Sequence, residues 1–448
     1  MIDPEDIRAH DNKTGNNRIL SDSEDEFEAL EFPPPNYYLS SVLPIKTCES
    51  APSSFTHRTS PVTKEKFEEF LDVDGRLINE HSFREAVFKG GIDSSIRKDV
   101  WKLLFGYYPY HSTKREREVV NMELRGKYDA LKQRWQRELT RINAKNYSES
   151  SSSNTVSDLI SIKSANQDYL FIQSQIYACR QSLDGSKLSE LINIIDKDVP
   201  RTMRWHNLFK DDDSLYLTTL RNILITFAAF HETVGYAQGM NDIAGRFLVV
   251  LDSESEAYWC FSNYVEHIQI DFLEKGMINK LELLRHLLRE VDADLYTYLN
   301  GCQVQDLAFC HRWLLLCFLR DFDFENGLRL FEIISSHYLE INSLQAEKAR
   351  ETTRQRTSEQ GGNASEYQVP ADSQMTFILF VCVTILTMNR SNLFSCSDVV
   401  SVFQCVNNLT KSLAVDEIML KAEMLFYAYC QKSVVETFHI IDTSNDKS

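Results

Sequence analysis

Cys310 and His311 are adjacent side chains whose types could support nucleophilic catalysis. Consecutive residues of a helix point in different directions, so a place in a core helix explains this pair better than a thiolate and its base. Other familiar catalytic patterns are missing from the sequence. It has no G-x-x-x-x-G-K-[ST] phosphate loop, no G-x-S-x-G elbow and no H-E-x-x-H helix. The chain is therefore not expected to bind a nucleoside triphosphate in a P-loop of its own.

Composition and charge narrow the class of protein further. The chain has 448 residues, of which 43% are apolar, so it can bury a substantial core. Its formal net charge of −17 argues against a general nucleic-acid binder, which normally carries a basic face. The 10 cysteines include no C-x-x-C pair, so a zinc site of the usual ligand spacing is not expected.

Hydropathy and the placement of the cysteines indicate a cytoplasmic protein. No apolar segment follows Met1, so a secretory signal is not expected. The longest apolar run, Phe377–Met388, is too short to span a bilayer and reads as a buried helix. Most cysteines lie in apolar stretches, as reduced core thiols do. Any association with a membrane should then be peripheral and depend on a partner.

The pattern along the chain divides it into a tail and one large helical region. Residues 1–60 mix acids, serines and prolines without a sustained period, which predicts a disordered acidic tail. Residues 61–440 show helical spacing in nearly every segment. A serine-rich stretch at about 145–165 and a polar stretch at about 343–373 interrupt this spacing and predict flexible insertions.

The helical region predicts an all-α fold, because no β-hairpin signal and no fixed repeat are present. Thr113 and Glu116 have the spacing of a capping box and should open a long helix with Trp135 on its apolar face. Further helices are predicted over residues 188–196, 215–230, 254–267, 278–291, 307–319, 375–388, 398–413 and 416–430.

Three short segments, in this order, resemble the signature motifs of the TBC family of Rab GTPase-activating proteins. They are Arg97-Lys98-Asp99-Val100-Trp101 (R-x-x-x-W), Ile195 to Thr202 (I-x-x-D-x-x-R-T) and Tyr236-Ala237-Gln238-Gly239-Met240 (Y-x-Q-G-M). The resemblance extends over roughly residues 61–432. It implies a two-lobed helical domain with a catalytic half at about 61–260 and a second half at about 261–440.

The resemblance implies that two side chains complete the active site of a partner GTPase. Arg201 stands at the position of an arginine finger, whose planar and permanently charged guanidinium can bond two phosphoryl oxygens at once. Gln238 stands at the position of a glutamine that orients the attacking water. The chain would then be a GTPase activator rather than an enzyme with its own nucleotide. GTP and Mg²⁺ would belong to the GTP-bound Rab partner, with no cofactor on this chain.

The remaining motif residues have supporting roles under the same resemblance. Asp198 is expected to hold the guanidinium of Arg201, with a solvent-exposed helix-terminal acid as the alternative. Gly235 and Gly239 would allow the positive φ values of a tight loop. Asn241 and Asp242 either contact the GTPase or cap the next helix. Tyr236, Gly239 and Met240 are expected to shape the loop rather than to touch GTP, and Thr202 is a further supporting residue of the motif. For Arg97 and Trp101, a structural pairing in the N-terminal half fits better than catalysis.

Two positions of the sequence depart from the family pattern. Met203 stands where many relatives carry an acid, and Gly245-Arg246 replaces a Ser-Pro or Ala-Pro pair. The additional arginine is expected either to alter GTPase preference or to disturb packing. An alternative function is a non-catalytic Rab-binding scaffold or effector in membrane traffic or autophagy. Since scaffold-like relatives often lack one finger, the presence of both Arg201 and Gln238 favours activation of a GTPase on internal membranes.

The acidic tail carries a second, independent pattern. Phe27 and Leu30 are separated by two residues and follow a run of acids. This arrangement resembles the short motif through which autophagy proteins bind ubiquitin-like modifiers by strand addition. Residues 24–30 are therefore a candidate binding site for such modifiers.

Overall fold

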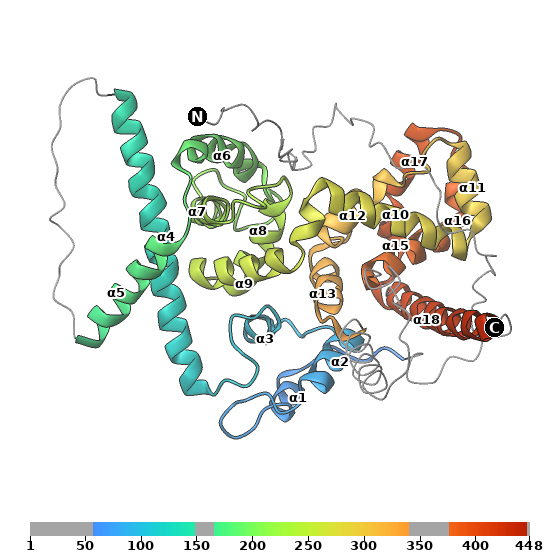
Figure 1. The fold of residues 1–448 in the computed structure, drawn as a ribbon, viewed down its shortest axis with the longest axis horizontal. Helices are drawn as coiled ribbons and strands as arrows, with labels where there is room; N and C mark the ends of the chain where they lie inside the picture. Colours follow the sequence, from blue (N-terminus) through green and yellow to red (C-terminus); the bar gives the residue numbers. More distant parts are fainter. Residues whose placement is uncertain (1–56, 148–164, 340–375, 446–448) are drawn as a thin grey trace, which may run out of the picture.

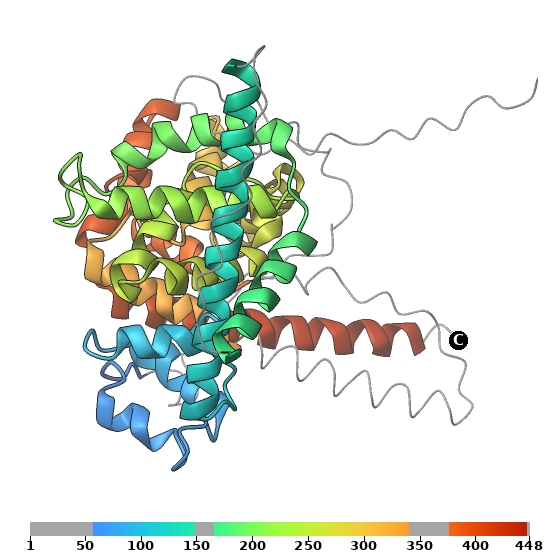
Figure 2. The same cartoon turned by 90° about the vertical axis from the view of Figure 1, so that its left-hand side faces the viewer.

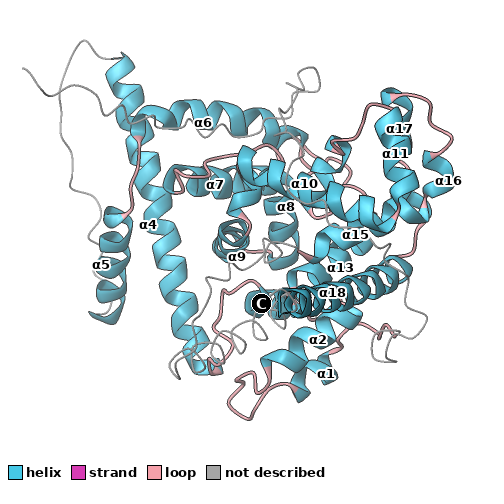
Figure 3. Cartoon of the chain, turned by 45° about the vertical axis from the view of Figure 1, so that its right-hand side comes forward, coloured by secondary structure: helices cyan, strands magenta, loops and turns pink. Residues whose placement is uncertain are grey.

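Residues 57–147, 165–339 and 376–445 are described by the computed structural model of the chain, and they are predominantly helical. The extended backbone in these ranges forms two isolated bridges, Val62 with Ile92 and Leu71 with Leu77, and Figure 3 draws no strand there. The helices are α1 Lys64–Glu69, α2 Glu80–Gly90, α3 Arg97–Leu104, α4 Lys114–Tyr147, α5 Ala165–Arg180, α6 Gly185–Asp198, η2 Val199–Arg201, α7 Leu215–Phe230, α8 Met240–Leu251, α9 Glu254–His267, η3 Gln269–Phe272, α10 Glu274–Val291, α11 Ala293–Gly301, η4 Ala308–Cys310, α12 His311–Leu316, α13 Phe324–Ser335, α15 Phe377–Met388, α16 Arg390–Leu393, α17 Val399–Val406, η6 Leu409–Ser412 and α18 Val415–Asn445.

The helices form two lobes, as expected for this fold. Figure 1 shows α6 to α9 packed together in one lobe, with the long helix α4 along its edge and α5 crossing α4. The second lobe contains α10 to α18, in which α15 packs against both α10 and α18. Figure 2 shows α18 extending beyond the body of the molecule. Helices α1 to α3 lie below both lobes in Figure 1, and α2 packs against α13 of the second lobe.

Several helices confirm the sequence pattern closely. Helices α7 and α9 begin and end at the predicted residues. The predicted capping box at the start of α4 is present, because the Thr113 hydroxyl accepts from the Glu116 amide at 3.1 Å and the Glu116 carboxylate accepts from the Thr113 amide at 2.7 Å. Nearly all of α15 is buried, which explains why its sequence is apolar all round.

Two of the predicted helices are wrong, because each is divided into two shorter elements in the structure. The single helix expected over residues 307–319 is a short 3-10 turn followed by α12, which ends at Leu316. Cys317 and Phe318 then have φ values of 47° and 61°, so the chain turns where a helix cannot continue. The helix expected over residues 398–413 is likewise divided into α17 and the 3-10 helix η6.

Arg97 and Trp101 have a structural role, but their shared partner is Glu332 in the second half of the domain, and not a residue of the N-terminal half as predicted. Both bond to the carboxylate of Glu332 on α13, Arg97 through Nε at 2.6 Å and Trp101 through Nε1 at 2.8 Å. The Ile92 amide donates to the other oxygen of the same carboxylate at 3.1 Å. Glu332 is fully buried, so these three donors compensate a charge that would otherwise be costly in the core. The interaction joins α3 to the second lobe.

Some predictions concern residues outside the described ranges. These are most of the acidic tail, including Phe27 and Leu30, and most of the insertions predicted at about 145–165 and 343–373. Within the ranges that the structure describes, no helix combines the length and hydropathy needed to cross a bilayer.

Candidate functional site

The candidate arginine finger lies where helix α6 gives way to a 3-10 turn. Asp184 caps the start of α6 by accepting from the Ser186 amide at 2.9 Å, and the helix ends at Asp198. Pro200 then lies in the first turn of η2, where its missing amide hydrogen is not needed. Arg201 ends η2, and its side chain is 59% exposed to solvent. This geometry holds the backbone of Arg201 in a short helix while its guanidinium faces outward.

Asp198 anchors the guanidinium from the buried side. Its carboxylate is only 7% exposed and accepts a bond from Nη2 of Arg201 at 2.7 Å. The hydroxyl of Tyr236 donates to the second oxygen of the same carboxylate at 2.6 Å. Burial, and then the nearby charge of Asp198, raise the pKa of Tyr236, so its hydroxyl remains a donor at neutral pH. The prediction that Asp198 holds Arg201 is confirmed.

The segment that carries Gln238 is a tight loop defined by two glycines. Gly235 and Gly239 have φ values of 63° and 99°, as the sequence predicts for both positions. Gln238 lies between them and is half-buried. A Cβ atom at Gly239 would lie 2.7 Å from Cδ2 of Leu316, so the loop backs directly onto α12. The shape of the loop is therefore fixed by backbone conformation and by contact with the second lobe.

Asn241 joins the two motif segments into one hydrogen-bonded unit. Its side-chain oxygen accepts from the Gly239 amide at 3.0 Å, and its amide nitrogen donates to the Thr202 hydroxyl at 2.9 Å. Thr202 in turn donates to the main-chain oxygen of Asp198 at 2.9 Å. Asn241 and Thr202 are both buried, so water does not compete for these bonds. Through this network and Tyr236, the loop of Gln238 and the turn of Arg201 are held together.

The structure contradicts one of the two alternatives that the sequence left open for Asn241 and Asp242, the capping of the next helix. Helix α8 begins at Met240 with Gly239 as its N-cap, so neither residue caps the helix. Both side chains are buried, and Asp242 pairs with Arg320, whose Nε lies 2.9 Å from the carboxylate. Sequence analysis missed Arg320, since it lies far from the motifs and no local spacing signals the pairing.

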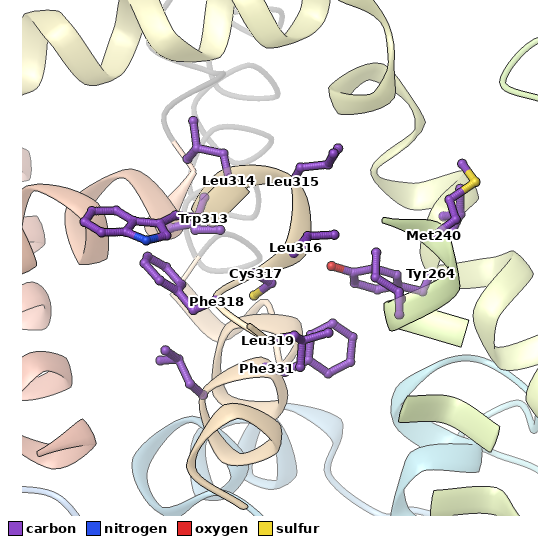
Figure 4. Close-up of a cluster of buried hydrophobic side chains, with 14 of the residues drawn as sticks. Met240, Tyr264, Trp313, Leu314, Leu315, Leu316, Cys317, Phe318, Leu319 and Phe331 are labelled. Atoms are coloured by element: carbon purple, nitrogen blue, oxygen red, sulfur yellow. The ribbon is translucent and has the colours of Figure 1, made fainter. Parts of the chain in front are cut away.

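Met240 supports the loop that carries Gln238 from the interior of the protein. Its sulfur accepts from the Ala237 amide at 3.3 Å, and its side chain is fully buried. Figure 4 shows Met240 in the same cluster of buried apolar side chains as Leu316 and Tyr264. The loop from Gly235 to Gly239 that carries Gln238, called the glutamine loop from here on, therefore packs on the apolar contact between α8 and α12.

The two departures from the family pattern meet in the structure. Met203 has a φ of 46° and is buried. A Cβ atom at Gly245 would lie 3.0 Å from the sulfur of Met203, so the glycine leaves the space that the methionine fills. Arg246 is also buried, with its guanidinium carbon 5.2 Å from the ring centre of Trp205 and 5.3 Å from that of Phe324. Met203 and Gly245 are thus packed against each other, and Arg246 packs against two aromatic rings.

The arrangement can present a fixed cation to an external anion. Arg201 is exposed, whereas Asp198, Tyr236, Thr202 and Asn241, which hold its turn and the glutamine loop, are buried. Among the described residues, no group of three or more His, Cys, Asp or Glu side chains is arranged to hold a metal ion.

The sequence of the chain matches the Rab-GTPase-TBC domain family over residues 94–346. Its relatives include TBC1 domain family member 17 of Mus musculus, which is 27% identical over 375 residues, covering 82% of this chain and 46% of the relative. TBC1 domain family member 25 of Mus musculus is 31% identical over 276 residues, which cover 61% of this chain and 31% of the relative. The GTPase-activating protein GYP7 of Yarrowia lipolytica is 27% identical over 416 residues, covering 87% of this chain and 46% of the relative.

The fold is similar to that of a solved structure, the Ypt/Rab-GAP domain of Gyp1p. The TM-score is 0.54 at 19% sequence identity, and the match covers 83% of this chain and 98% of that domain. The chain spans less than half of the length of the three curated relatives named above.

Proposed function

The chain belongs to the Rab-GTPase-TBC domain family, and from this premise we propose that it accelerates GTP hydrolysis by a Rab-type small GTPase. The observation that carries the proposal is the carboxylate of Asp198, which bonds both Arg201 and Tyr236. One buried group thereby fixes the exposed guanidinium relative to the loop that carries Gln238. Two fingers acting on one nucleotide need such a fixed relation, because misplaced groups lose most of their effect.

Arg201 supplies the charge that the reaction requires. During phosphoryl transfer, negative charge spreads over the equatorial oxygens and the leaving oxygen. A guanidinium inserted from outside neutralises this charge and is worth about 10³ to 10⁵ in rate, or roughly 4 to 7 kcal/mol. Its exposure leaves Arg201 accessible to a partner, and the bond to Asp198 restrains the rotamers that it would otherwise explore.

Gln238 supplies the group that orients water. Its side-chain amide can donate one hydrogen bond and accept another, so it can hold a water molecule in line with the phosphorus atom. The half-buried position between Gly235 and Gly239 restricts its movement. GTP and Mg²⁺ are contributed by the partner GTPase, and the chain itself supplies no cofactor. Recruitment to internal membranes is proposed to follow from binding that GTPase.

The proposal is tested by measuring single-turnover GTP hydrolysis for a panel of purified Rab GTPases with and without the chain. We expect strong acceleration of at least one Rab. Arg201→Ala should remove about 10³-fold or more of that acceleration. Arg201→Lys should restore little, because an ammonium cannot bond two oxygens in one plane.

The alternative is a scaffold that binds the GTPase without activating it. A scaffold predicts that the chain binds a GTP-loaded Rab while the hydrolysis rate remains at its intrinsic value. Gln238→Ala gives an independent check, since its loss should lower kcat even when Arg201 is intact. If both single variants retained full acceleration, the two-finger mechanism would be wrong.

A further inference from the structure

The loop that follows the arginine finger presents a tryptophan to solvent. This loop, residues 203–214, joins η2 to α7 and is fixed by the buried side chains of Met203 and Phe209. Its backbone is closed by bonds from the His206 amide to Met203 at 2.8 Å and from the Phe209 amide to His206 at 3.0 Å. Trp205 lies between these anchors and is 62% exposed. A tryptophan is highly buried in most proteins, so this exposure within an anchored loop calls for an explanation.

A buried arginine supports the inner face of Trp205. Arg246 on α8 is 3% exposed, and its guanidinium lies against the rings of both Trp205 and Phe324. Its Nη2 donates to the main-chain oxygen of Leu319 at 2.9 Å. Nε and Nη1 of Arg246 have no hydrogen-bond acceptor in the part of the chain that the structure describes. These N–H groups are therefore compensated mainly by the aromatic faces and by the nearby charge of Asp242.

The cation remains charged in this environment. Burial lowers the pKa of Arg246 to about 10, which still leaves the guanidinium protonated at neutral pH. Burying a charge is costly, and here part of the compensation comes from a ring that is itself mostly exposed. The contact with Arg246, together with the edge-on ring contacts to His206 and Phe324, thus restricts the orientation of an indole that remains 62% exposed.

The position of Trp205 in the chain, close to the arginine finger, indicates which partner covers its exposed ring. Trp205 lies four residues after Arg201, at the start of the same loop. A protein whose nucleotide receives the guanidinium of Arg201 binds within four residues of Trp205 along the chain. Solvent-exposed tryptophans held in a fixed orientation are typical binding hot spots, since they bury a large apolar area at a low cost in entropy.

We propose that Trp205 anchors the partner GTPase by inserting its indole into an apolar pocket beside the bound nucleotide, and that Arg246 positions it from behind. This inference rests on the proposed function and assigns to the same site a binding residue distinct from the two fingers. Trp205 contributes to the affinity for the GTPase, whereas Arg201 and Gln238 act on the transition state. The departure at Arg246 then affects which partner is bound by orienting the anchor.

The test separates binding from catalysis with the most strongly accelerated Rab of the purified panel. Trp205→Ala should raise KM about 30-fold or more and change kcat less than about threefold, because it removes uniform binding. Trp205→Phe should recover most of the affinity, since it retains an aromatic ring. The matched control is Tyr169→Ala on α5, which removes an aromatic ring of 63% exposure outside the loop and should leave both constants unchanged.

Arg246 is tested through its effect on Trp205. Arg246→Met keeps an unbranched side chain and should raise KM, whereas in a Trp205→Ala background it should cause no further increase. Thermal unfolding of each variant verifies that the protein remains folded. Independent, additive effects on KM would contradict the positioning role.

The outcomes distinguish this inference from the proposed function. If KM is unchanged in Trp205→Ala while acceleration is still lost in Arg201→Ala, the proposed role of Trp205 in binding is refuted and the proposed function is not affected. A fall in kcat at constant KM overturns it as well, because Trp205 would then act through the finger. If the wild-type chain accelerates no Rab in the panel and Arg201→Ala behaves like wild type, the proposed function fails and the anchor fails with it.

Discussion

Replacing Asp198 with asparagine tests whether a buried carboxylate positions the finger. The carboxylate accepts from Arg201 with one oxygen and from Tyr236 with the other, whereas an amide offers one accepting oxygen. Asp198→Asn therefore loses one of the two bonds together with the charge. An arginine side chain carries about 2 kcal/mol of rotamer entropy, so releasing Arg201 is expected to lower kcat by up to about 30-fold.

The same substitution should affect stability through Tyr236 rather than through Arg201. Because the Arg201 side chain is 59% exposed, its ion pair contributes only about 0 to 1 kcal/mol to the free energy of unfolding. Tyr236 is buried, and weakening its hydrogen bond costs about 1 to 3 kcal/mol. Urea unfolding measures this loss, and single-turnover GTP hydrolysis at saturating concentrations of the chain measures kcat.

Two controls make the interpretation specific. Tyr236→Phe removes the tyrosine bond but keeps the carboxylate next to Arg201, so it should lower stability with a smaller loss of kcat than Asp198→Asn. Asp196→Asn makes the same change two residues earlier in α6, at an acid that pairs with Arg221, and should leave kcat unchanged. A kcat for Asp198→Asn within threefold of wild type, with the protein folded, would refute the positioning role.

Three further predictions concern stability and loop geometry. Glu332→Ala should lower the free energy of unfolding by about 3 to 5 kcal/mol in urea titrations, because it removes the buried acceptor of Arg97, Trp101 and the Ile92 amide and leaves Arg97 paired with the exposed Glu325. Burial raises the pKa of Glu332 to about 7, despite the lowering effect of Arg97 and Trp101. The folded state then binds more protons than the unfolded state between the ordinary glutamate value and pH 7, so stability should fall as pH rises from 5 to 8. This pH dependence should be weaker in Glu332→Gln, and equal slopes in urea titrations would contradict it. Gly239→Ala should lower both stability, by about 1 to 3 kcal/mol, and kcat, because alanine disfavours a φ of 99° and its Cβ would lie 2.7 Å from Leu316. Urea unfolding and GTP hydrolysis check this, and the control Gly301→Ala, where nothing lies within 4 Å of the added atom, should retain the wild-type kcat.

The parts of the site that sequence could predict depend on short separations. Asp198 and Arg201 are three residues apart, so one helical turn places them together, and the structure confirms their pairing. The positive φ values of Gly235 and Gly239 follow from the residue type in a tight loop. By contrast, the bond from Tyr236 to Asp198 spans 38 residues, and that from Arg97 to Glu332 spans 235. No local period encodes such contacts.

The errors in the predicted helices have a related cause. The predicted helices do not include α8, whose polar residues Asn241, Asp242 and Arg246 are buried rather than turned to solvent. The break after α12 occurs at Cys317 and Phe318, which adopt positive φ values although neither is glycine, asparagine or aspartate. Tertiary packing imposes these conformations: both side chains are buried in the apolar core beside Leu316 (Figure 4).

The distribution of burial around the site explains how an exposed arginine can be exact in position. Arg201 must remain accessible, so it cannot be fixed by packing of its own side chain. The constraint comes instead from buried neighbours on two separate segments, Asp198 on α6 and Tyr236 on the glutamine loop. Tyr236 donates to the carboxylate of Asp198, and the same carboxylate accepts from Arg201. Moving either segment breaks a bond in a region that water does not reach, where an unpaired polar group is costly. The same principle extends to Trp205, because its exposed ring is held by the buried guanidinium of Arg246. The side chains proposed to meet the partner are thus positioned by buried residues, which is why substitutions of the buried set should alter kcat and KM although the exposed side chains themselves are unchanged.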